Sequence, residues 1–196
     1  ESLIAIKGGT IITVSAGIIN NGVVLIQDNL IKEMGQGVAI PPSAVVVDAT
    51  GAFVMPGLIE AHCHVGIAEE AAPVEGNDIN ETTDPVTPYL RALDGVNLND
   101  MAFNDAVRSG VTRLMIHPGS ANVIGGQSVL LKSCAPAVLD MVYRQPWGVK
   151  AALGENPKRV YGFQNKVPKT RMASAALLRE ALFTARRLSD KESLEP

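Results

Sequence analysis

Hydrophobic and polar positions follow one pattern up to about residue 56 and a different one after it. The first part holds short runs of β-branched and other apolar residues, broken by Gly and Asn, and such runs are typical of strands. They span residues 2–14, 22–35 and 44–57. The segment 27–29 is predicted to be a hairpin tip, and residues 49–51 divide the last run into two. Residues 1–56 therefore predict a small sheet or half of a β-sandwich.

Residues 57–196 show strand and helix patterns in alternation. A strand is predicted over 57–66, and the long polar loop 67–95 follows it. Residues 98–110 have helical spacing of apolar positions, with Asn99 as the predicted N-cap, Asp100 in the first turn and Gly110 at the end. Further strands are predicted over 111–119, 127–133 and 148–154, and an amphipathic helix over 170–193. This alternation predicts βαβ units and a parallel sheet, which is an α/β fold.

Composition narrows the classes of function. The net charge is −3, and no run of Lys or Arg exceeds two residues, so we expect no nucleic-acid surface. No window has the roughly 20 apolar residues that cross a membrane, and the first residues lack the pattern of a signal peptide. Two cysteines, Cys63 and Cys134, are too few for a disulfide framework, so a reducing, cytoplasmic location is expected.

The most specific chemical signal is a pair of histidines at the end of the strand predicted over 57–66. Residues i and i+2 of a strand point to the same face, so His62 and His64 point together and Cys63 points away into the core. Two imidazoles placed in this way can both reach one divalent metal at about 2.0–2.1 Å. The alternative is that both rings only donate hydrogen bonds to neighbouring backbone.

The surroundings of this pair resemble the amidohydrolase superfamily of metal-dependent hydrolases, in particular its imidazolonepropionase-like or prolidase-like branch. The first barrel strand of that superfamily carries a Pro-Gly turn, two apolar residues, an acidic residue and two alternating histidines. The matching residues are Pro56, Gly57, Leu58, Ile59, Glu60, His62 and His64. Segments 77–95, 109–112, 118–132 and 152–162 extend the resemblance along the chain. It implies a (β/α)₈ TIM barrel, here about its first half in residues 57–196, preceded by part of a small β-sandwich in residues 1–56.

The resemblance also implies a bridging ligand from a later barrel strand, either a carboxylated lysine or a glutamate. Lys150 lies in the strand predicted over 148–154, which would be the fourth barrel strand. Its ammonium group must first react with CO₂ before it can offer carboxylate oxygens. Glu155 follows at the C-terminal end of that strand, where barrel active sites are built. Glu155 needs no modification and is slightly favoured, and its alternative role is a carboxylate at a helix N-terminus.

Other polar residues could contact a substrate. His117 ends the strand predicted over 111–119, and it is either a substrate contact or a hydrogen-bonded loop histidine. The loop 118–127 adds Asn122 and Gln127 as hydrogen-bonding groups. Cys134 has no neighbouring histidine in the sequence, so we do not expect it to act as a nucleophile.

The resemblance implies more ligands than this chain contains. It calls for two further histidines and a catalytic aspartate from later strands, but no histidine follows His117. The leading hypothesis is a metal-dependent hydrolase of C–N bonds in a cyclic or peptide-like amide, with one or two divalent metals, of which Zn²⁺ is favoured. The partners would be a small-molecule substrate and either a second copy or a second chain that completes the barrel. The alternative is a non-catalytic amidohydrolase-like subunit or fragment that packs on a partner chain.

Overall fold

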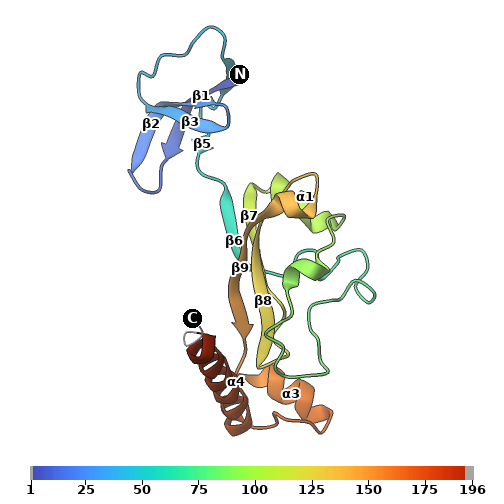
Figure 1. Ribbon diagram of the computed structural model, residues 1–196. Helices are drawn as coiled ribbons and strands as arrows, with labels where there is room; N and C mark the ends of the chain where they lie inside the picture. Colours follow the sequence, from blue (N-terminus) through green and yellow to red (C-terminus); the bar gives the residue numbers. More distant parts are fainter. Residues whose placement is uncertain (1, 193–196) are drawn as a thin grey trace. The chain divides into compact units, whose positions relative to one another are not determined.

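The computed structural model describes residues 2–192 and consists of two compact units, Glu1–Gly57 and Leu58–Pro196 (Figure 1). The division lies one residue after the boundary predicted from the change of pattern.

The first unit is one five-stranded sheet. Its strands are β1 (Leu3–Ile12), β2 (Ile18–Gln27), β3 (Leu30–Gly35), β4 (Val45–Asp48) and β5 (Phe53–Val54). The order is β3-β2-β1-β4, and β5 also pairs with β1. Asp28 and Asn29, at φ values of 50° and 66°, form the tight turn between β2 and β3, so the predicted hairpin tip is confirmed. The predicted break at residues 49–51 is also confirmed, because it separates β4 from β5.

The second unit contains a four-stranded sheet in the order β6-β7-β8-β9. The strands are β6 (Leu58–Cys63), β7 (Val111–Ile116), β8 (Ile124–Lys132) and β9 (Val142–Ala151). β6 and β7 are parallel, and the segment that connects them contains the 3₁₀ helix η1 (Ala92–Gly95) and helix α1 (Met101–Arg108). This part is a βαβ unit, as predicted.

The prediction of a parallel sheet is wrong for β8. This strand is antiparallel to both β7 and β9, so β6, β7 and β9 run in one direction and β8 in the other. The connections explain the difference. Only residues 117–123 separate β7 from β8, and residues 133–141, with the short helix α2 (Val138–Met141), separate β8 from β9. A parallel crossover needs a dozen residues or more, whereas connections of this length join antiparallel neighbours.

The N-cap of helix α1 lies one residue after the predicted one. Asp100, and not Asn99, is the N-cap, and its carboxylate accepts a hydrogen bond from the backbone N–H of Ala102 at 3.3 Å. The same buried carboxylate also accepts from the N–H of Gly66 at 3.0 Å, so it joins the helix to the segment that follows β6. Gly110, at φ +78°, ends the helix as predicted, because it adopts the left-handed conformation that other residues disfavour.

The core of the second unit lies on one face of its sheet. Ile67, Phe103 and residues of β7 and β8 such as Ile116 and Leu131 pack there. Helices α3 (Glu155–Phe163) and α4 (Arg171–Glu192) follow β9. The amphipathic C-terminal helix is thus confirmed as far as residue 192, although its predicted last residue lies outside the described residues. Within residues 2–192, no helix is both long and apolar enough to cross a membrane.

Candidate metal centre

The two predicted histidines lie where β6 ends. His62 is in the strand and His64 follows it directly, and their ring centroids are 5.7 Å apart with the rings almost perpendicular. The backbone N–H of His62 donates to the Glu60 carboxylate at 3.0 Å. Cys63 packs against the hydrophobic core, as predicted from strand alternation, and burial raises the pKa of its thiol.

The proton on His64 is placed by its backbone partner. Its Nδ1 atom lies 2.7 Å from the carbonyl oxygen of His117. A carbonyl only accepts hydrogen bonds, so Nδ1 carries the hydrogen and Nε2 has a free lone pair. This arrangement, in which one ring nitrogen donates to a backbone carbonyl, is common in histidines that bind a metal through the other nitrogen.

His117 lies against the pair as the third histidine of the cluster. Its ring centroid is 4.9 Å from that of His62, and its Nε2 atom is 3.3 Å from the carbonyl oxygen of Ala61. Its Nδ1 atom is 2.6 Å from the hydroxyl of Ser128, a buried residue of β8 that no sequence motif marks. Burial lowers the pKa of His117, which favours the neutral ring.

Lys150 is the predicted ligand that the structure brings to the histidines. Its register partner on β8 is Gly126, and its Nζ atom lies 3.2 Å from Nε2 of His62. The charge of Lys150 lowers the pKa of His62, and burial lowers the pKa of Lys150 itself. Both shifts favour neutral groups, which are the forms that bind a metal (imidazole) or react with CO₂ (amine).

Glu155, the other predicted ligand, is the first residue of α3 and is exposed. Its carboxylate accepts a hydrogen bond from Lys158 at 2.9 Å, and this interaction lowers the pKa of Glu155. No hydrogen bond or ion pair between described residues joins Glu155 to the histidines. The structure places Glu155 at the N-terminus of α3 and Lys150 beside the cluster, and the choice of ligand stays a prediction.

The two other predicted substrate residues are hydrogen-bonded within the protein. Asn122 is buried, and its amide nitrogen donates to the carbonyl of Glu81 and to the hydroxyl of Thr87. The amide nitrogen of Gln127 donates to the carbonyl of Pro88 at 3.3 Å. Their role in substrate binding stays a prediction. Here both side chains connect the polar loop after β6 to the β7–β8 region.

The donor set fits a metal only if Lys150 takes part. Among residues 2–192, no group of three or more His, Cys, Asp or Glu side chains is placed to hold a metal ion. Apart from His117, whose ring nitrogens lie near Ser128 and the carbonyl of Ala61, the cluster offers the imidazoles of His62 and His64 and the amine of Lys150. Carboxylation of Lys150 would add oxygen donors beside His62 and would give the three protein ligands that are usual for a catalytic Zn²⁺ site.

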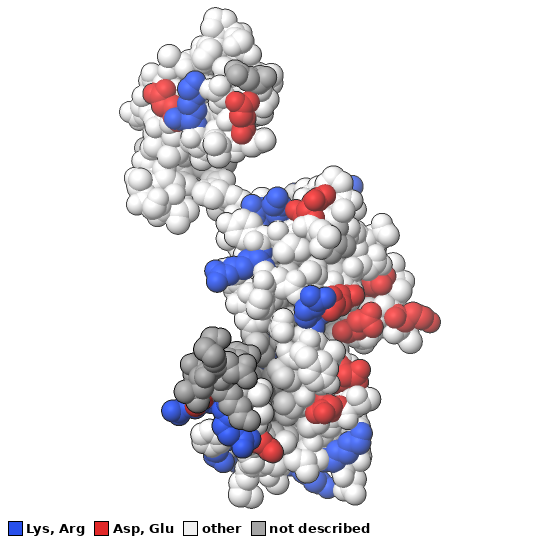
Figure 2. All heavy atoms as spheres, in the orientation of Figure 1, with Lys and Arg blue, Asp and Glu red and all other residues white. Residues whose placement is uncertain are grey.

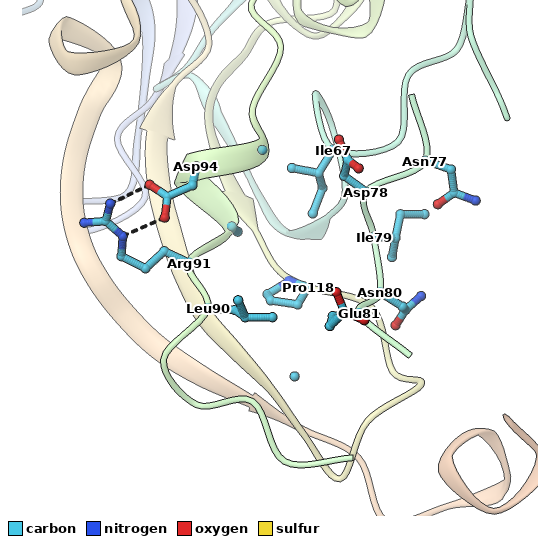
Figure 3. A pocket seen from close by; sticks show the side chains of 13 residues that line it. Ile67, Asn77, Asp78, Ile79, Asn80, Glu81, Leu90, Arg91, Asp94 and Pro118 are labelled. Carbon is cyan, nitrogen blue, oxygen red and sulfur yellow. Dashed lines mark hydrogen bonds and ion pairs between the residues drawn. The ribbon is translucent and has the colours of Figure 1, made fainter. Parts of the chain in front are cut away.

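A cavity of about 250 Å³ lies under the polar loop and is separate from the histidines. Arg91 and Asp94 form an ion pair at its edge, and Asp78, Asn80 and Pro118 also line it (Figure 3). None of the four histidine-cluster side chains, His62, His64, His117 and Lys150, is among its lining residues.

On the face seen in Figure 2, basic and acidic side chains are interspersed.

Comparison with known proteins identifies the family of the chain. A solved amidohydrolase of Thermotoga maritima MSB8 matches 97% of this chain with a TM-score of 0.91 and 39% sequence identity, and the match covers 49% of that structure's chain. The amidohydrolase tasK of Hapsidospora irregularis is 32% identical over 181 residues, which is 85% of this chain and 18% of tasK. An adenine deaminase of Listeria monocytogenes serovar 1/2a is 31% identical over 156 residues, which is 78% of this chain and 22% of the deaminase.

These similarities confirm the resemblance carried by the residues around His62 and His64. The chain belongs to the amidohydrolase superfamily. It spans about half the length of the solved Thermotoga protein and about a fifth of these two curated relatives. In a scan of protein families, no family model matches the chain.

Proposed function

We propose that this chain contributes to a metal-dependent hydrolase that cleaves a C–N bond in a cyclic or peptide-like amide. The observation that carries the proposal is the position of Lys150, whose Nζ atom lies 3.2 Å from Nε2 of His62 although the residues are 88 positions apart. Relatives named amidohydrolase and adenine deaminase support the reaction class.

Each residue of the cluster has a distinct role in this proposal. His62 and His64 would hold the metal through Nε2, and carboxylated Lys150 would supply carboxylate oxygens in place of the Glu155 ligand that the sequence favoured. In carboxylation the neutral amine of Lys150 attacks CO₂, an N–C bond forms and a proton is released. A bound divalent metal, for which Zn²⁺ suits the imidazole ligands, supplies a water of pKa near 7 and polarises the substrate carbonyl.

Metal affinity and intact mass test this proposal in the full chain. His62→Ala, His64→Ala and Lys150→Ala should each weaken Zn²⁺ binding, measured by calorimetry, by more than the 10–100-fold that loss of an outer-shell partner costs. Lys158→Ala is the matched lysine control, because among residues 2–192 the partner of the Lys158 ammonium is Glu155 and not a histidine. Native mass spectrometry at raised bicarbonate should show an added mass of one CO₂ that Lys150→Ala removes.

Glu155→Gln separates the two candidate ligands. If Lys150 is the ligand, Glu155→Gln should leave Zn²⁺ affinity unchanged. A large loss in Glu155→Gln together with normal binding by Lys150→Ala would assign the role to Glu155 and overturn the proposed ligand set.

A non-catalytic role is the second candidate, and exposed apolar side chains of the second unit favour it. Ile59 of β6, Tyr143 and Val149 of β9, and Phe163 of α3 are all exposed. A subunit that only packs on a second copy or a second chain needs no metal. In that case His62→Ala would leave assembly unchanged, measured by sedimentation, and wild-type protein would not bind Zn²⁺.

A further inference from the structure

A buried hydroxyl lies next to the histidines and is not one of the proposed metal ligands. Ser128 of β8 is 1% exposed, and its Oγ atom is 2.6 Å from Nδ1 of His117. His117 in turn contacts Ala61 of β6 through Nε2 and His64 through its backbone carbonyl. Three neighbouring strands, β6, β7 and β8, are therefore linked by side chains at the level of the histidine pair.

We propose that Ser128 and His117 are positioning residues that hold His64 and the backbone next to His62 in the geometry for metal binding. This inference rests on the proposed function, because it concerns the same site. It assigns His117 neither as a metal ligand nor as a substrate contact, and it gives Ser128 a role that the sequence motifs do not mark.

The direction of each hydrogen bond follows from the carbonyl acceptors. The carbonyl of Ala61 only accepts, so Nε2 of His117 carries the hydrogen, and Nδ1 is left as an acceptor for the hydroxyl of Ser128. The carbonyl of His117 likewise fixes the hydrogen of His64 on Nδ1. Both ring nitrogens of His117 are then used within the protein, and Nε2 of His64 presents its lone pair.

The strut made by Ser128 and His117 acts at two points of the site. Ala61 directly precedes His62, so the bond from His117 restrains the backbone from which the His62 ring projects. The carbonyl of His117 orients the ring of His64. Outer-shell hydrogen bonds of this kind fix the tautomer and orientation of histidine ligands. Without the Ser128 hydroxyl, Nδ1 of His117 loses its donor and the ring can change tautomer or turn.

The test compares Ser128→Ala with a matched control, Ser133→Ala. Ser133 directly follows β8, is 4% exposed, and has a hydroxyl without a hydrogen-bond partner among the described residues. Both variants remove one buried hydroxyl from the same region, but only Ser128→Ala breaks the strut. Ser128→Thr restores a hydroxyl, and thermal unfolding shows whether each variant folds.

Two measurements report whether Ser128 and His117 hold the site in this way, and the first measurement needs no metal. Two-bond ¹H–¹⁵N spectra of the histidine rings in the metal-free full chain report each tautomer, and this chain has three histidines to assign. Wild type should show Nε2–H for His117 and Nδ1–H for His64, and Ser128→Ala should give a mixed His117 signal. Zn²⁺ affinity, measured by calorimetry, should fall by about 10–100-fold in Ser128→Ala, recover in Ser128→Thr and stay unchanged in Ser133→Ala.

The outcomes separate this inference from the proposed function. An Nδ1–H tautomer of His117 in wild type, or a folded Ser128→Ala with unchanged ring signals and Zn²⁺ affinity, would overturn the role of Ser128 even if the metal binds. The predicted tautomers in a wild-type protein that binds no Zn²⁺ would support the strut and would contradict the proposed function.

Discussion

At the scale of single residues, the buried Tyr161 joins three segments of the second unit through its hydroxyl. Its hydroxyl lies 2.7 Å from Oδ1 of Asn122 and 2.8 Å from the carbonyl of Asp84, so α3 is joined to the polar loop and to the β7–β8 connection. Tyr161→Phe leaves these acceptors without their donor and should lower the free energy of unfolding by about 1–3 kcal/mol. Urea denaturation measures the loss, and Tyr89→Phe is the control because Tyr89 is 68% exposed.

The contribution of the Tyr161 hydroxyl to the free energy of unfolding should also depend on pH. Burial, with the charges of Asp84 and Glu81, raises the pKa of Tyr161 from its ordinary value of 10 to about 12. The folded state therefore favours the protonated phenol, and this contribution is complete below pH 10 and is lost as the pH rises through about 12. The difference in unfolding free energy between wild type and Tyr161→Phe should shrink over that interval. A difference that is constant from pH 9 to 12 would contradict the assignment.

At the scale of the element, the stability of helix α1 depends on the carboxylate of Asp100. The carboxylate accepts from the backbone N–H groups of Gly66, Glu70 and Ala102, so it caps the helix and closes the segment after β6. Asp100→Ala should cost about 2 kcal/mol or more, since three donors lose their acceptor in a buried place. Asn99→Ala, at the exposed neighbouring position, should change stability by less than about 0.5 kcal/mol. Equal losses in denaturation experiments would show that the cap is not the cause.

The elements also show what the sequence could predict and what it could not. Most strands could be located because β-branched runs and glycines mark them, although β9 begins at Val142, six residues before its predicted start at residue 148. The pair His62 and His64 was predictable because strand alternation places both on one face. The reversed direction of β8 was missed, since its buried apolar run looks the same in either direction. The short segment 117–123 was the available signal. Ser128 was missed for the same reason, because its contact with His117 exists only when β8 turns back along β7.

At the scale of the whole molecule, every residue of the candidate site belongs to the second unit. His62, His64, His117, Ser128 and Lys150 all follow Gly57, where the first unit ends. Each unit also has buried side chains of its own, such as Leu25 in the first and Leu131 in the second. This division predicts that the stability of the first unit and the metal affinity of the second can be changed separately.

A pair of cavity-forming substitutions tests that separation. Leu25→Ala and Leu131→Ala each remove a buried side chain, and each should destabilise its own unit by about 2–5 kcal/mol. Leu131 lies on β8, three residues from Ser128, so its loss should also weaken Zn²⁺ binding in calorimetry. Leu25→Ala should leave Zn²⁺ affinity at the wild-type value, because all the proposed ligands lie in the second unit. Weaker Zn²⁺ binding by a folded Leu25→Ala protein would instead mean that the first unit helps to hold the metal site in place.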